Sequence, residues 1–150
     1  MDEKLQVLDI EEQEAIGSAL VLAIKECPDI IRAKKNIMFE SIDSGKIGLF
    51  PQQGSIYLKK FISGSFIAQY NFFLRHRTRP STDKQKLEAE ELLNKVASWL
   101  ENEIEYPELT DGRTIESISR TSHAFAADMA EDGEMDHQIY LSLKFRRIKK

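Results

Sequence analysis

The side chains that most often perform chemistry are sparse in this sequence of 150 residues. The histidines, His76, His123 and His137, are scattered, and no HExxH motif or cysteine partner gives them the spacing of metal ligands. His76 lies in an apolar, β-rich segment, which is typical of a structural imidazole. The single cysteine, Cys27, ends an apolar helical pattern, so we expect a buried structural thiol.

Motifs of common enzyme classes are also absent. No GxSxG, Walker or GxGxxG motif occurs, and "GKIG" (45–48) lacks the length and the Ser or Thr of a phosphate-binding loop. The acidic run 128–136 has the composition of a calcium loop without the Asp-x-Asp-x-Asp-Gly spacing. We therefore expect that the protein is not an enzyme and binds no cofactor and no metal ion. The remaining alternative is an enzyme that uses carboxylates in an unfamiliar catalytic arrangement.

The most informative polar pattern is a stripe of arginines at alternate positions, Arg75, Arg77 and Arg79, at the end of a long β-rich segment. Three interpretations are open. Charge can protect an edge strand from mispairing, or bases spaced about 6.5–7 Å apart can follow a phosphate backbone. The third, which we favour, is pairing with acids of an adjacent subunit, such as the 128–136 run. Nucleic acid is disfavoured by the formal net charge of −4 and by the lack of aromatic residues there besides Phe73.

Charge is unevenly distributed near the C-terminus. "DMAEDGEMD" (128–136) has five acids and no base, whereas "KFRRIKK" (144–150) has five bases and no acid. This segregation indicates either a local pair or two surfaces that contact different partners. We expect a basic tail over about 147–150.

Composition indicates one ordinary globular domain spanning residues 1–150. Apolar residues make up 41% and charged residues 31% of the chain, and a chain of this length can bury a substantial core. The apolar run "ALVLAI" (19–24) is far too short to span a bilayer. The N-terminal "MDEKLQ" has no apolar segment, so we expect neither a secretory signal nor a membrane partner.

The predicted order of elements is helix, strand, hairpin, helix, strand, strand. Apolar spacing predicts a helix that starts at Asp9 and that Pro28 ends, and a capping box of Thr82 and Gln85 begins a second helix that runs to about Ile104. Strands are predicted at 36–43, 55–62, 64–79, 113–122 and 137–146, with loops at 44–54 and 124–136 that order on docking. The predicted fold class is α+β: a mostly antiparallel sheet packed with two helices in a single domain.

The hairpin formed by 55–62 and 64–79 has apolar residues on both faces, so both need a cover. A two-residue turn would place Tyr57 opposite Tyr70 and end the partner strand opposite Phe72. Residues 73–79 would then lack a partner, and we expect a neighbouring copy to complete the sheet. A bulge would exchange the faces. The alternative is a monomer whose two helices cover both faces.

Several segments together resemble the minor capsid or tail-completion proteins of tailed phages and prophages of Gram-positive bacteria. The resemblance covers roughly residues 10–147 and rests on the segments "GKIGLFP", "GSIYLKKFISGSFIAQYNFFLRHRTR", "LLNKVASWLE", "DGRTIESISRTS" and "EDGEMDHQIYLSLKFRR". It implies a structural virion protein at the head–tail junction and, more specifically, a tail terminator. Such a protein forms a ring, expected to have six copies, that caps the tail tube and docks onto the head connector. The resemblance supplies no catalytic residues.

The partners that the resemblance implies are further copies of the chain, the tail tube protein and the head–tail connector or neck protein. The tape measure protein and genomic DNA passing through the lumen are additional candidates. The protein would reside in the virion, and in the host cytoplasm during assembly. Two alternatives remain: a neck adaptor on the portal side, and a small nucleic-acid-binding module. The expected contact residues are Phe50, Pro51, Phe73, Arg75, Arg77, Arg79, Asp128, Glu131, Asp132, Arg146 and Arg147.

Overall fold

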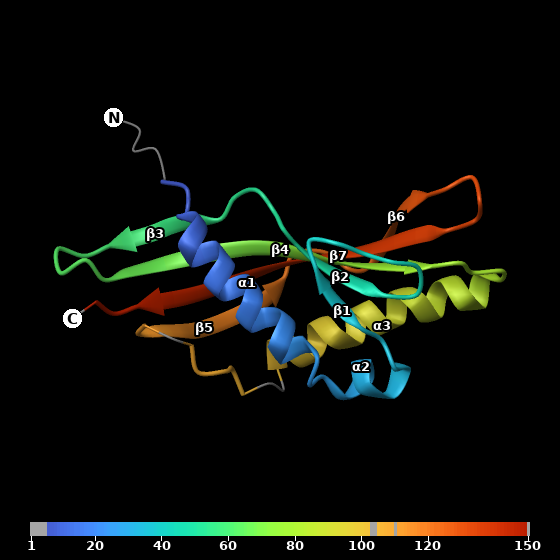
Figure 1. The fold of residues 1–150 in the computed structure, drawn as a ribbon, viewed down its shortest axis with the longest axis horizontal. Coiled ribbons are helices and arrows are strands. Elements are labelled where there is room, and N and C mark those ends of the chain that lie inside the picture. Colours follow the sequence, from blue (N-terminus) through green and yellow to red (C-terminus); the bar gives the residue numbers. More distant parts are fainter. Residues whose placement is uncertain (1–5, 103–104, 110, 150) are drawn as a thin grey trace.

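The computed structural model describes residues 6–102, 105–109 and 111–149, which form three helices and one seven-stranded sheet (Figure 1). The predicted α+β class is therefore confirmed. In chain order the elements are α1 (Ile10–Ile24), α2 (Pro28–Ala33), β1 (Ile37–Phe39), β2 (Ile47–Pro51), β3 (Ile56–Lys60), β4 (Phe66–Thr78), α3 (Asp83–Asn102), β5 (Arg113–Arg120), β6 (Phe125–Met129) and β7 (Met135–Arg147).

Two long antiparallel strands, β4 and β7, form the spine of the sheet. Each has 13 residues, and they pair from Phe66 opposite Arg147 to Thr78 opposite Met135. The strand order is β1-β2-β4-β7-β5, with β3 also pairing with β4 and β6 also pairing with β7. The β1–β2 pair is parallel, and the other ladders of the described strands are antiparallel. The spine spans roughly 40 Å and carries a hairpin at each end (Figure 1).

The end of β4 finds its partners within its own chain, so the predicted need for a neighbouring copy there is wrong. β2 pairs with residues 72–76 of β4, and β7 pairs along its other edge. The expected loop 44–54 contains the strand β2, so this prediction is wrong in part. Gly48 and Pro51 are typical of turns, and the strand was missed for that reason. β4 is consequently a central strand, which also removes the edge-protection interpretation of the arginine stripe.

The predicted β3–β4 hairpin is present with a different turn. The Phe61 N–H donates to the Ser65 carbonyl (2.9 Å), and a bulge follows Tyr57. Tyr57 therefore pairs with Ala68 instead of Tyr70. Before the bulge the register is displaced by two residues, so Ile56 and Tyr57 keep their expected faces. After it, Lys60 pairs with Phe66, and the displacement of one residue exchanges the faces of Lys59 and Lys60, as a bulge was expected to do.

One face of the sheet, here called the inner face, packs against the helices. Tyr70 of β4 lies beneath α1: a Cβ added to Gly17 of α1 would be 3.1 Å from the Tyr70 hydroxyl. Further along β4, His76 contacts the Ala89 carbonyl of α3. No helix of the described residues lies over the other face, here called the open face. The expectation of a cover on both faces therefore holds for the inner face alone. The inner face of β4 carries Phe66, Ala68, Tyr70, Phe72 and Leu74, all of them buried.

The helices follow most of their predicted signals. Thr82 Oγ1 accepts from the Gln85 N–H (3.2 Å), as in a capping box, whereas the Gln85 side-chain oxygen accepts from the Ser81 N–H (2.6 Å). Pro28 ends the first pattern but also begins α2, at the position where its missing N–H costs least. No helix of the described residues is long and apolar enough to cross a membrane. The predicted helix end at Ile104 and the start of the N-terminal "MDEKLQ" lie outside the described residues.

The closing strand follows its predicted alternation. Ile139, Leu141, Leu143 and Phe145 are buried on the inner face, and Cys27 is buried as expected. The expected loop 124–136 contains β6 and the first residues of β7, so this prediction is wrong in part. β7 also continues through Arg147, the residue at which a tail was expected to begin.

Candidate functional site

The arginine stripe lies on the open face and is bound by acids of its own chain. Arg77 forms a bidentate pair with Asp136, with Nε 2.8 Å from Oδ1 and Nη2 3.1 Å from Oδ2. Arg75 Nη1 lies 3.5 Å from the same carboxylate. Arg79 reaches Asp132 (3.1 Å) and Glu134 (3.7 Å). The predicted partner segment, 128–136, is thus correct, but its assignment to an adjacent subunit is wrong.

Chain topology explains this pairing. Because β4 and β7 are antiparallel, Arg77 lies directly opposite Asp136, and Arg75 lies diagonally from it on the same face. Asp136 is nearly buried, with 7% of its side chain exposed, whereas Arg75 and Arg77 are each 28% exposed. A bidentate pair between arginine and a carboxylate fixes the geometry of both groups and is stronger than a neutral hydrogen bond. The guanidiniums of the stripe are therefore paired with carboxylates of the same chain and are not a row of unpaired positive charges.

Beside the stripe, aromatic rings cross four strands of the open face. This aromatic row consists of Phe50 (β2), Phe73 (β4), Tyr140 (β7) and Phe125 (β6). Successive ring centroids are 5.1, 5.7 and 5.6 Å apart. The Arg75 guanidinium lies 5.8 Å from the Phe50 ring and 5.6 Å from the Phe73 ring, within cation–π range.

The aromatic row is half-buried although no helix covers it. Phenylalanine, tyrosine and arginine are enriched where proteins contact each other. Phe50, Phe73 and Arg75 were predicted as contact residues, and the structure brings them together. Tyr140 and Phe125 were not predicted; Tyr140 was visible as a large ring at an outward position of the closing strand. Pro51 ends β2 next to Phe50.

The other predicted contact residues lie at the two ends of the spine. Asp128, Glu131 and Asp132 belong to the β6–β7 hairpin. Arg146 and Arg147 lie at the opposite end, where β7 finishes. Arg146 makes an exposed pair with Glu116 (3.1 Å). The structure therefore groups the predicted residues into a central patch and two separate ends.

Arg147 belongs to a buried ionic cluster that sequence reasoning missed. Glu12 of α1 accepts from Arg113 (2.9 and 2.8 Å) and from Arg147 (2.7 Å), and both Glu12 and Arg113 are 3% exposed at the side chain. Burial alone would raise the pKa of Glu12, but the hydrogen bonds and charges of the two arginines more than offset it and lower the pKa. This cluster ties α1 to β5 and β7 and has a structural role.

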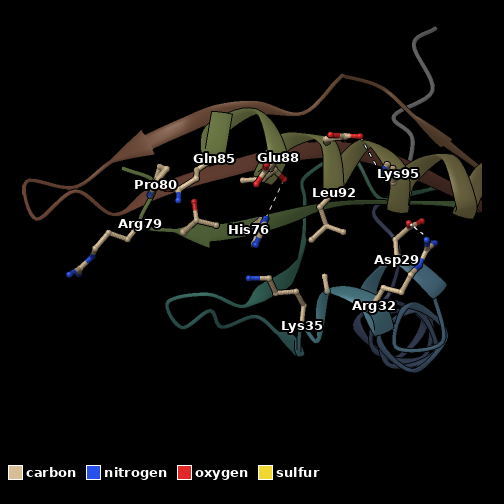
Figure 2. Close-up of a pocket in the computed structure, with 14 residues that line it drawn as sticks. Asp29, Arg32, Lys35, His76, Arg79, Pro80, Gln85, Glu88, Leu92 and Lys95 are labelled. Carbon is tan, nitrogen blue, oxygen red and sulfur yellow. Dashed lines mark hydrogen bonds and ion pairs between the residues drawn. The ribbon is translucent and has the colours of Figure 1, made fainter. Parts of the chain in front are cut away.

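A separate pocket of close to 600 Å³ lies between α2, α3 and the end of β4. Figure 2 shows Lys35 on one wall, Leu92 and Glu88 of α3 on the opposite wall, and His76 between them. Two of its ion pairs are local to one helix, Asp29 with Arg32 (3.0 Å) and Glu91 with Lys95 (3.2 Å). The Lys35 ammonium donates to the Gly45 carbonyl (2.9 Å), and burial lowers the pKa of Lys35.

The imidazole in this pocket is neutral. Burial lowers the pKa of His76 to about 4, and the Ala89 carbonyl lies 3.3 Å from Nδ1, so that nitrogen carries the proton. Nε2 has no hydrogen-bond partner among the described residues. The structural imidazole expected here, with its hydrogen bonds satisfied, is therefore matched at Nδ1 and not at Nε2 among the described residues. Within the described residues no group of three or more His, Cys, Asp or Glu could hold a metal ion.

Comparison with known proteins gives a fold and no family. No family model and no curated protein matches the sequence. Among solved structures, one chain of the "Virion of native gene transfer agent (GTA) particle" shares the fold with a TM-score of 0.61 and 10% sequence identity. The match covers 88% of this chain and 98% of that chain. At this identity the likeness shows a common fold, and it extends over nearly all of both chains.

Proposed function

We propose that the chain is a structural virion protein that acts by binding other proteins and performs no catalysis. The observation that carries this proposal is the fold shared, almost end to end, with a chain of a gene transfer agent virion. The sequence resemblance to phage minor capsid and tail-completion proteins supports it independently. The aromatic row, half-exposed on a sheet face without a helix, gives such a protein a surface for its neighbours.

Within this class we propose the role of tail terminator. The protein forms a ring, of six copies in the role that the resemblance implies, that caps the tail tube and joins it to the head connector. Its partners are then the tail tube protein and the connector, with the tape measure protein and passing DNA as transient neighbours. A neck adaptor on the portal side is the alternative, and capture of purified portal or tube protein by the chain separates the two roles.

Removing the chain from the phage or prophage that encodes it tests the proposal. We expect filled heads and unattached tails of irregular length in electron micrographs. Joined particles with tails of normal length would overturn the terminator role. If mass spectrometry of purified wild-type virions also fails to detect the chain, the structural role is overturned as well.

Variants of the aromatic row test the surface. Phe73→Ala combined with Tyr140→Ala should leave the circular dichroism spectrum unchanged but abolish incorporation into virions. Ile31→Ala, which truncates an apolar side chain that is 57% exposed on α2, is the matched control and should incorporate normally. Full incorporation of the double variant would show that the aromatic row is not a contact surface. Salt-sensitive binding of DNA that Arg75→Ala weakens would instead favour the nucleic-acid-binding alternative.

A further inference from the structure

The two hairpins of the molecule have opposite charge. At one end, the β3–β4 turn and the adjoining C-terminal segment form the basic tip, defined here as Lys59, Lys60, Phe61, Ile62 and Lys149. At the other end, the β6–β7 turn forms the acidic hairpin, defined here as Asp128, Met129 and Glu131. Figure 1 shows the two hairpins at opposite ends of the long axis.

The basic tip exposes apolar area beside lysines that have no acidic partner among the described residues, although the Lys60 ammonium donates to the Gln6 side chain and lies 4.2 Å from the centroid of the Tyr57 ring. Ile62 is fully exposed and Phe61 is 39% exposed, with the Lys59 ammonium 5.2 Å from the Phe61 ring. Lys149 is held beside the turn because its N–H donates to Ser65 Oγ (2.9 Å). None of these lysines makes an ion pair within the part of the chain that the structure describes.

The acidic hairpin has the converse arrangement. Asp128 lies directly across from Asp136, whose carboxylate is already bound by Arg77 and Arg75. Like charges directly opposite in a sheet are unfavourable, and Asp128 Oδ1 accepts a hydrogen bond from the Met129 N–H (2.9 Å) rather than from a cationic side chain. Met129 beside it is 63% exposed. No ion pair of the described residues involves Asp128 or Glu131.

These charges cannot neutralise each other within one molecule. The spine separates them by roughly 40 Å, several times the Debye length of about 8 Å at physiological salt. Each end presents exposed apolar side chains flanked by lone charges, and the sign at one end is opposite to that at the other. A second copy of the chain offers an acidic hairpin to the basic tip and a basic tip to the acidic hairpin.

We propose that the basic tip of one copy docks onto the acidic hairpin of the next copy. Because the contact joins two different patches, it is heterologous and repeats from copy to copy, as a closed ring requires. This inference rests on the proposed function, because it names the contact between subunits of the proposed ring. The sequence led us to expect that a neighbouring copy completes the sheet; here the copies meet through their hairpins instead.

Charge reversal with mixing tests the contact. Lys59→Glu with Lys60→Glu makes both ends acidic, and Asp128→Lys with Glu131→Lys makes both ends basic. Each purified protein is measured by native mass spectrometry and analytical ultracentrifugation at low and high salt. The matched controls are Lys25→Glu with Lys95→Glu and Glu14→Lys with Glu88→Lys. They change the net charge equally at exposed positions within α1 and α3 or, for Lys25, directly after α1.

We expect the wild-type chain and both controls to associate at low salt and to dissociate at high salt. Each reversed variant alone should lose at least about tenfold in affinity, and their equimolar mixture should associate again, because every mixed contact pairs opposite charges. A wild-type chain that stays monomeric at high concentration and low salt would overturn the proposal. So would reversed variants that associate as the wild type does, or a mixture that stays dissociated.

Virions separate this inference from the proposed function. If phage carrying Lys59→Glu with Lys60→Glu still build joined tails of normal length, the docking contact is wrong and the structural role stands. If phage lacking the chain altogether build such tails, the proposed function falls, while the association measured in solution remains valid. The two failures are therefore distinguishable.

Discussion

Phe72 and Phe73 are adjacent residues on opposite faces of β4, and their surroundings differ sharply. Phe72 is fully buried beneath the helices, whereas Phe73 lies half-buried in the aromatic row, stacked on Phe50. A strand with apolar residues on both faces therefore has two tasks. The inner face stabilises the fold, and the open face leaves large rings partly exposed, which is the surface proposed above for binding other proteins.

The charged groups of the two regions differ in the same way. The Glu12–Arg113–Arg147 cluster is sealed between α1 and the sheet, whereas the Arg79–Asp132 pair near the open face has side chains 60% and 57% exposed. Buried charges are costly to separate, and exposed pairs contribute little. Stability should thus respond strongly to changes on the inner side and weakly to changes on the open side.

The largest contrast is expected between the two phenylalanines. Phe72→Ala should lower the free energy of unfolding by about 4 kcal/mol, because it leaves a cavity in a fully packed core. Phe73→Ala should cost about 1 kcal/mol, since part of its ring is already in water. Urea denaturation followed by fluorescence of Trp99 measures both. Equal losses would mean that the open face is as much a part of the core as the inner face.

The next contrast concerns the ion pairs. Arg113→Leu removes the bidentate partner of a buried carboxylate and should destabilise by about 3 kcal/mol. Arg79→Leu, the matched change at an exposed pair, should cost less than about 1 kcal/mol. Thermal unfolding of both variants provides the measurement. A small effect of Arg113→Leu would show that Arg147 alone can compensate Glu12.

Sequence patterns predicted the regular parts of the fold for identifiable reasons. The alternation from Ile139 to Phe145 gives the closing strand one apolar face, and it appears as predicted. β2 was missed because Gly48 and Pro51 are typical of turns, although Gly48 is required where the Ser41 carbonyl would lie 2.5 Å from a Cβ. The hairpin register depended on a bulge after Tyr57 that no residue type announces.

The candidate site was predicted by residue type better than by arrangement. The arginine stripe and the acidic segment were correctly matched, but sequence separation hid that the β4–β7 ladder brings Arg77 and Asp136 together in one chain. The aromatic row draws one ring from each of four strands. Such a row exists only once strand order is known, so no local pattern could reveal Phe125 as a member.

The inner face should also respond to pH through its buried histidines. Burial lowers the pKa of His76 to about 4. Burial also lowers the pKa of His137, although the charge and hydrogen bond of the Glu90 carboxylate partly offset this shift. The unfolded chain therefore binds more protons between pH 6.5 and 4, so stability is complete above pH 6.5 and falls as the pH drops toward 4. For His76 the loss should reach about 3 kcal/mol.

Unfolding free energies of two glutamine variants at a series of pH values isolate this contribution. His76→Gln should flatten the profile between pH 6.5 and 4, although it also alters the contact with the Ala89 carbonyl at every pH. His123→Gln, at an exposed position, is the control and should leave the slope unchanged. A slope that survives in His76→Gln would assign the acid sensitivity to His137 or to carboxylates such as Glu12.

The smallest contrast is between two tyrosine hydroxyls. The Tyr70 hydroxyl is buried on the inner face without a hydrogen-bond partner among the described residues, and burial, followed by the charge of Glu40, raises its pKa. Tyr70→Phe should therefore be neutral or stabilise the fold by up to about 1 kcal/mol, because an unsatisfied buried group is removed. Tyr140→Phe on the open face loses a hydrogen bond to Gln138 (3.1 Å) and should destabilise by about 0.5 kcal/mol. Opposite signs from the same chemical change would show that the unpartnered hydroxyl on the inner face costs stability whereas the hydrogen-bonded hydroxyl on the open face contributes to it. A loss in Tyr70→Phe would reveal a partner for its hydroxyl.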